Sequence, residues 1–125
     1  HLFARLLETQ GDIKKLTKEE KNLAKDAKNY MDRMYSRDIR IQDVAGILHV
    51  HPNYLSTLFR REYDQSPREY LRKVRMNQAK LLLATTEYSI SDISSDVGYT
   101  NPFQFSKVFK SCYGISPTEY RNMRQ

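Results

Sequence analysis

The sequence from Ile39 onward contains two copies of one pattern, and this internal repeat restricts the fold more than any other feature. Residues 39–75 form the first copy and residues 88–124 the second. Ile41, Asp43, Val44 and Leu48 align with Ile90, Asp92, Ile93 and Val97 at an offset of 49 positions. A one-residue insertion in the second copy raises the offset to 50, and Pro52, Leu55, Ser56, Phe59, Ser66, Pro67, Glu69 and Tyr70 then align with Pro102, Phe105, Ser106, Phe109, Ser116, Pro117, Glu119 and Tyr120. We therefore expect two similar folded units.

Each copy has the pattern of a helix, a tight turn and a second helix. In the first helix of each copy the apolar residues recur at three- and four-residue spacing. The small residues Ala45 and Ser94 lie where a second helix must cross closely. We expect turns with positive φ at His49 and Gly98. Pro52 and Pro102 suit the first position of the second helices, which are anchored inward by Leu55, Leu58, Phe59, Phe105, Val108 and Phe109.

Helix-start signals complete the predicted architecture. Ser66–Glu69 and Ser116–Glu119 are capping boxes, and the helix opened by the first should run from Pro67 to about Ala84 and join the copies. Its apolar contacts are assigned to Tyr70, Leu71, Val74, Ala79, Leu81 and Leu82. Thr17 and Glu20 open an earlier helix with the apolar stripe Leu23, Ala27, Tyr30, Met31 and Met34, and a short apolar segment, Leu2 to Leu7, should stop at Gly11.

The prediction is an all-α fold of about seven helices, with two helix-turn-helix subdomains, a long linker helix and an extra N-terminal helical segment. Residues 17–66 would form the first subdomain, residues 67–85 the linker helix and residues 86–125 the second subdomain. Residues 1–16 would be a linker remnant or a helical segment from a missing N-terminal domain, because the chain begins at His1 rather than at a methionine.

The overall charge favours a polyanionic partner. The net charge is +6 and the isoelectric point is near 9.5. No apolar run is long enough for a membrane span, so no membrane partner is expected. The single cysteine, Cys112, has no partner for an internal disulfide, which is typical of a cytoplasmic protein, and we expect it to be buried or half-buried.

Catalytic and metal-binding patterns are missing from the sequence. His49 and His51 have no Cys, Asp or Glu at ligand spacing, so they are interpreted as a turn residue and a helix cap. No nucleophile elbow, phosphate loop or catalytic carboxylate pair occurs. An enzyme, a metal site and a cofactor are therefore not expected.

Several motifs resemble the C-terminal DNA-binding domain of the AraC/XylS family of transcription regulators. They are Gly98-Tyr99, Phe105-Ser106-Lys107-Val108-Phe109-Lys110, Gly114-Ile115-Ser116-Pro117, Tyr120-Arg121 and the linker stretch 75–82. The resemblance covers about residues 39–121. It implies a seven-helix fold, two helix-turn-helix motifs, binding to asymmetric promoter sites, and a separate N-terminal domain that senses a small-molecule effector or dimerises. It also makes RNA polymerase an expected partner.

The second helix of each copy should face double-stranded DNA with the residues that do not face the core. The expected base contacts are Asn53, Ser56 and Thr57 in the first copy and Phe103, Gln104, Ser106 and Lys107 in the second. The expected phosphate contacts are Arg60, Arg61, Arg72, Lys110 and Arg121, together with helix N-terminal N–H groups. Phe103 can instead pack inside, and Arg75 is interpreted as a structural hydrogen-bond donor.

The linker helix is expected to set the two recognition helices about one duplex turn apart, on the order of 34 Å, so that a monomer reads successive major grooves. The alternative is a helical module that binds only a protein partner. An adaptor of that kind would expose apolar residues on its second helices, whereas Asn53, Gln104 and Lys107 are polar or basic.

Overall fold

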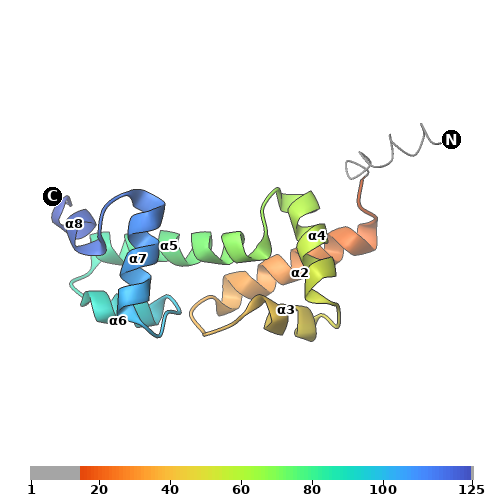
Figure 1. Ribbon diagram of the computed structural model, residues 1–125, viewed down its shortest axis with the longest axis horizontal. Coiled ribbons are helices and arrows are strands. Elements are labelled where there is room, and N and C mark those ends of the chain that lie inside the picture. The colour runs from red at the N-terminus through yellow and green to blue at the C-terminus, as the bar shows by residue number, and fades with distance from the viewer. Residues whose placement is uncertain (1–14, 125) are drawn as a thin grey trace. The chain divides into compact units, whose positions relative to one another are not determined.

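The computed structural model describes residues 15–124, in which seven helices and no strand occur (Figure 1). They are α2 (Lys18–Met34), α3 (Ile41–Ile47), α4 (Pro52–Tyr63), α5 (Pro67–Thr85), α6 (Ile90–Asp96), α7 (Pro102–Tyr113) and α8 (Pro117–Asn122). The all-α prediction, with two helix-turn-helix pairs and a long helix between the copies, is confirmed. The predicted segment from Leu2 to Leu7, with its stop at Gly11, lies outside the described residues.

The described residues divide into two compact units. One comprises residues 15–30 and 41–69, and the other comprises residues 31–40 and 70–124. In the first, α3 packs against α4; in the second, α6 packs against α7 and α7 against α8 (Figure 1). The chain therefore builds the same helix pair twice, as the repeat predicts.

The predicted capping boxes form at the starts of α2, α5 and α8. At α2 the main-chain N–H of Thr17 donates to Glu20 at 2.9 Å, and the N–H of Glu20 donates back to the Thr17 hydroxyl at 3.1 Å. The same reciprocal pairs join Ser66 to Glu69 and Ser116 to Glu119. Each pair satisfies two N–H groups that the helix leaves without partners.

The first unit is built on small and branched apolar side chains. The small residues are needed where helices approach closely, and Ala24, Ala27 and Ala45 have no exposed surface. The larger buried residues are Val44 of α3 and the α4 anchors Leu55, Leu58 and Phe59. Because α4 buries these three positions, its remaining faces are left to the solvent.

The second unit contains a continuous core cluster of residues from three helices. They are Met76, Ala79 and Leu83 of α5, Ile93 of α6, Val97 directly after α6, and Phe105 and Phe109 of α7. The ring of Phe109 lies 5.7 Å from that of Tyr120, which attaches α8 to α7. Lys80 completes this cluster with its ammonium 4.6 Å from the centre of the Tyr113 ring.

Arg75 is the structural donor predicted from the sequence. It is 9% exposed, and its guanidinium donates to the carbonyl oxygens of Tyr35 at 2.9 Å and Arg37 at 2.8 Å. Burial lowers the pKa of Arg75 from its ordinary value, while Tyr99 and Asp38 favour the charged form. The side chain therefore attaches the connection between α2 and α3 to α5.

Two burial predictions were wrong. Leu81 is 54% exposed and Leu83 is buried instead. Two residues along a helix turn the side chain by about 200°, so Leu81 lies opposite the stripe of Ala79 and Leu83. Cys112 is exposed. It lies in the last turn of α7, where the next residue, Tyr113, packs against the core and so turns Cys112 about 100° away from it.

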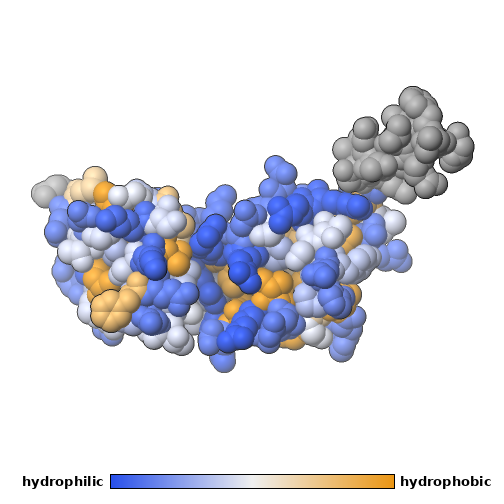
Figure 2. Space-filling model, in the orientation of Figure 1, coloured by the Kyte–Doolittle hydropathy of each residue, from blue (hydrophilic) through white to orange (hydrophobic). Residues whose placement is uncertain are grey.

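None of the helices described is both long and apolar enough to cross a membrane. Hydrophilic side chains cover most of the face drawn in Figure 2.

Candidate nucleic-acid interface

The same turn sets the direction of the second helix in both copies. His49 has φ 60° and Gly98 has φ 100°, as predicted. The main-chain N–H of His49 donates to the Gly46 carbonyl at 3.1 Å, and that of Gly98 donates to Ser95 at 3.1 Å. These matched bonds form the same turn in both copies, and the second copy then takes one residue more to reach the start of α7.

Side-chain caps occupy the first N–H groups of both recognition helices. At α4, His51 Nδ1 accepts from the N–H of Asn53 at 3.0 Å. At α7, Asn101 Oδ1 accepts from Phe103 at 2.8 Å and from Gln104 at 3.3 Å. These three N–H groups are therefore engaged within the protein, and the outer side chains carry the recognition chemistry.

In the first copy the predicted base-facing residues lie away from the core. Asn53 and Thr57 are exposed and Ser56 is half-buried. The Thr57 hydroxyl donates to the Asn53 carbonyl at 3.0 Å, which leaves its oxygen as an acceptor. This face of α4 can therefore hydrogen-bond with Asn53 and accept through Thr57.

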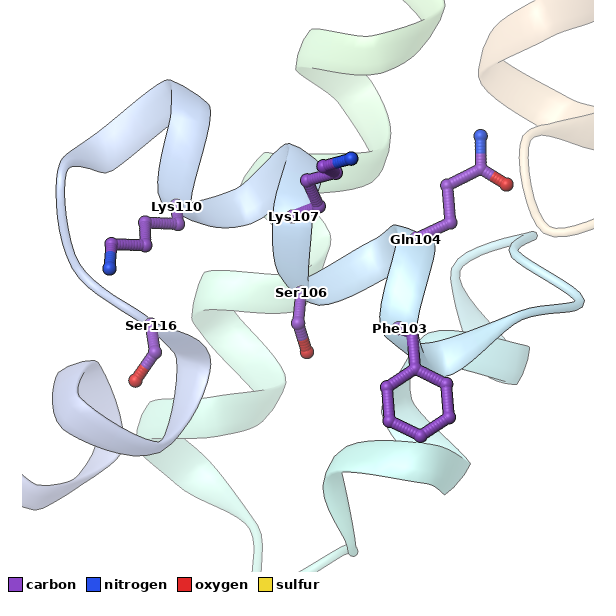
Figure 3. Close-up of a pocket in the computed structure, with 6 residues that line it drawn as sticks. All are labelled: Phe103, Gln104, Ser106, Lys107, Lys110 and Ser116. Atoms are coloured by element: carbon purple, nitrogen blue, oxygen red, sulfur yellow. The ribbon is translucent and has the colours of Figure 1, made fainter.

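In the second copy the predicted residues border an open groove of about 650 Å³. Figure 3 shows Phe103, Gln104, Ser106, Lys107 and Lys110 extending from α7, and Ser116 from the start of α8. Phe103 is 85% exposed, which excludes the alternative that it packs inside. The groove combines two ammonium groups, an amide, hydroxyls and one aromatic ring.

Ser116 is the groove residue that the sequence interpretation missed. It was assigned only as a helix cap, and its Oγ does accept from the N–H of Glu119 at 3.0 Å. The left-handed turn at Gly114, with φ 83°, reverses the chain after α7 and returns Ser116 beside α7. The sequence signal for this position was the glycine two residues before Ser116, since a turn at Gly114 brings Ser116 back beside α7.

The predicted phosphate contacts fall into two groups. Arg60, Arg61, Arg72 and Lys110 are exposed. Arg121 is half-buried, and its guanidinium donates to the carbonyls of Leu83 at 3.2 Å, Thr86 at 3.2 Å and Tyr88 at 2.6 Å. Its phosphate contact remains a prediction, but these bonds give it a place at the C-terminus of α5.

The recognition helices carry positive charge with nearby acids held ionised. A main-chain hydrogen bond from Ser116 is the first cause that lowers the pKa of Glu119, and Lys110 lowers it further. Glu20 has a lowered pKa for the same reason at Thr17, with a smaller contribution from Arg61. Among the residues described, no group of three or more His, Cys, Asp or Glu could hold a metal ion.

The chain is similar in sequence to known proteins. The family described as Helix-turn-helix domain matches residues 44–123. The arabinose operon regulatory protein of Escherichia coli K12 is 37% identical over 101 residues, which are 80% of this chain and 35% of that protein. The chain spans 34 to 41% of the length of other curated relatives that it matches.

Two solved structures have the same fold. The C-terminal domain of AraT, a response regulator from Geobacillus stearothermophilus, is 36% identical with a TM-score of 0.80, covering 82% of this chain and 86% of that one. A transcriptional regulator from Chromobacterium violaceum, described by its AraC-type DNA-binding domain, is 25% identical with a TM-score of 0.73, covering 86% and 96%. Both matches cover more than four fifths of this chain, 82% and 86%.

Proposed function

We propose a function that follows from the family: the chain belongs to the AraC-type helix-turn-helix DNA-binding domains, a family of transcription regulators and not of enzymes. We infer that it binds double-stranded promoter DNA with sequence preference, using α4 and α7 as the two recognition helices. The base contacts are Asn53, Ser56, Thr57, Phe103, Gln104, Ser106 and Lys107. The phosphate contacts are Arg60, Arg61, Arg72, Lys110 and Arg121.

One observation carries this proposal: each recognition helix buries its apolar side and leaves outward a side on which polar and basic residues outnumber the exposed aromatic ones, Tyr54 and Phe103. In α7, Phe105 and Phe109 are fully buried while Gln104, Lys107 and Lys110 are exposed. An amide and an ammonium can hydrogen-bond to the acceptors of base edges, and ammonium groups neutralise phosphates. A purely protein-binding helix would present an apolar stripe on this side.

The two copies would act together on one face of the duplex. Residues 17–66 and 86–125 serve as the two subdomains, and residues 67–85 as the helix that links them. A monomer would place α4 and α7 in successive major grooves, about one duplex turn or 34 Å apart. If the spacing of the protein falls short of that turn, the DNA bends, at a cost of roughly 1–6 kcal/mol.

The full-length protein is proposed as a cytoplasmic bacterial regulator that contacts RNA polymerase. The relatives matched are longer than this chain, and additional sequence offers a place for a domain that senses a small metabolite. Effector binding there would alter DNA binding by the present domain.

The test is fluorescence anisotropy of the fragment with labelled promoter duplexes over a salt series. Binding should weaken with a log–log slope near −0.9 for each neutralised phosphate. Lys110→Ala should reduce the slope by about 0.9, whereas Lys25→Ala, which removes the same charge from an exposed position of α2, should leave it unchanged. If no duplex binds at low salt, a protein-binding module is the better interpretation.

A further inference from the structure

Phe103 is exposed to an extent that the fold does not explain. Its side chain is 85% exposed, compared with 68% for Met123 and 54% for Leu81, the next most exposed large apolar residues described. An exposed aromatic ring gains nothing for folding, since its apolar area stays in water. In Figure 3 the ring extends from the first turn of α7, away from the helix.

The helix-turn-helix does not need an aromatic residue at this position. By the repeat, Phe103 corresponds to Asn53, which occupies the same first-turn position in α4. The start of α7 is fixed by the backbone: Pro102 is the first helical residue, and Asn101 accepts from the N–H of Phe103 at 2.8 Å. The ring can therefore be changed without removing any bond that starts the helix.

The neighbours of Phe103 indicate what the ring would meet. It borders the same groove as Gln104 and Lys107, which are the polar base contacts proposed for this copy. In the major groove the base edges present acceptors, amino donors and a single apolar group, the C5-methyl of thymine. 5-Methylcytosine carries the same methyl group at the same ring position.

We propose that Phe103 reads the 5-methyl group of a pyrimidine in the half-site bound by α7. The inference rests on the proposed function and assigns to α7 an apolar specificity that α4, with Asn53, lacks. The first half-site would be read without an aromatic side chain at this position, and the second by hydrogen bonds together with the methyl contact of Phe103. Binding would respond to thymine and to cytosine methylation at that single position.

The experiment begins with a duplex of about 40 bp enriched by the wild-type fragment from a randomised pool. Each thymine is then replaced by uracil in turn, which removes only the methyl group. One position should weaken wild-type binding about fourfold, the value of one buried methyl group. Placing cytosine there should weaken binding further, and 5-methylcytosine should recover part of the loss.

Phe103→Ala tests whether the preference for the methyl group comes from Phe103. The variant should bind the thymine and uracil duplexes equally, whereas Phe103→Leu should keep part of the preference. Met123→Ala, which truncates an exposed apolar residue elsewhere, should discriminate like the wild type. Circular dichroism should show unchanged helicity, and the wild-type uracil series tests the methyl effect without any substitution.

The outcomes separate this inference from the function beneath it. If the wild type enriches no sequence, the proposed function fails. If it enriches one but no uracil replacement matters, or the uracil effect persists in Phe103→Ala, the methyl assignment is wrong. The proposal is also overturned if Phe103→Ala weakens binding to the thymine and uracil duplexes by the same factor, so that the wild-type preference is kept. That result indicates a ring that stacks on or wedges between bases.

Discussion

His49 and Gly98 occupy the same turn of the two copies in different surroundings. A Cβ built on Gly98 would lie 2.8 Å from Nε of Arg75 and would overlap the Tyr35 carbonyl oxygen. His49 is exposed and carries a side chain at φ 60°. The turn therefore tolerates a side chain in the first copy and excludes one in the second.

Gly98→Ala should destabilise the protein by about 3 kcal/mol or more, since backbone strain adds to overpacking against main chain. Gly114→Ala is the matched control: φ there is 83°, but nothing lies within 4 Å of the added Cβ, so about 1 kcal/mol of strain is expected. Urea unfolding of both variants measures the difference. Equal losses would mean that the contact with Arg75 and Tyr35 is not rigid.

Lys107→Ala should relax sequence preference at one base pair of the second half-site by about 1–3 kcal/mol. The exposed ammonium borders the α7 groove, where it can reach guanine acceptors. Competition binding with single-base variants of the enriched duplex measures the preference. An equal loss on specific and random DNA would reassign Lys107 to a phosphate.

Single positions differ in how well the sequence predicts them. Positive φ at His49 and the caps at His51 and Asn101 follow from local residue chemistry and were predicted. Asp64, at φ 60°, was missed although the repeat pairs it with Gly114. The bonds of Arg121 join residues more than 30 positions apart, and no local pattern marks them.

Helix α8, at the scale of an element, is too short to be stable alone and depends on its attachments. Arg121 and Arg124 both donate to carbonyls at the end of α5, and Arg124 pairs with Glu87. α5 ends without a glycine cap, so these guanidinium groups satisfy the carbonyl of Leu83 in its last turn and that of Thr86 just after it, and favour its dipole.

Arg121→Lys should destabilise the protein by about 1–3 kcal/mol, because a single ammonium cannot reach three carbonyls. As a phosphate contact, Arg121 should lower the salt slope of DNA binding by about 0.9 when it is replaced by alanine, whereas Arg121→Lys keeps the charge and should leave the slope unchanged. Thermal unfolding and the salt series together check this. An unchanged slope in the alanine variant would make Arg121 a structural residue alone.

The capping box of α8 should make stability depend on pH. The pKa of Glu119 is lowered in the folded protein by the Ser116 main-chain N–H, so its contribution is complete above the unfolded pKa and is lost as pH falls through the folded one. Glu119→Gln keeps an acceptor but does not titrate. Its unfolding free energy should fall less than that of the wild type between about pH 7 and pH 3; parallel curves would contradict this.

At the scale of the molecule, the repeat predicted two helix pairs because burial demands recur at fixed spacing, as in Leu55, Phe59, Phe105 and Phe109. The candidate interface was predicted by elimination, because the residues of α4 and α7 that the core does not need are available for recognition. The exposure of Phe103 could not be obtained in this way, because an apolar side chain fits either a core or a contact.

Helix α5 has 19 residues, and at 1.5 Å per residue it spans about 28 Å without a break. The linking role proposed for α5 predicts that binding depends on the half-site spacing. Inserting half a helical turn (about 5 bp) between the half-sites should reduce binding to that of one half-site, with the salt slope lowered to match. Inserting a whole turn (about 10 bp) should not restore it, because the added turn lengthens the separation by about 34 Å, more than the length of α5. Methylation protection should cover two major grooves on the uninserted duplex and one on either insertion. Restored affinity with the longer insertion, or protection of a single groove throughout, would contradict a monomer that reads successive grooves.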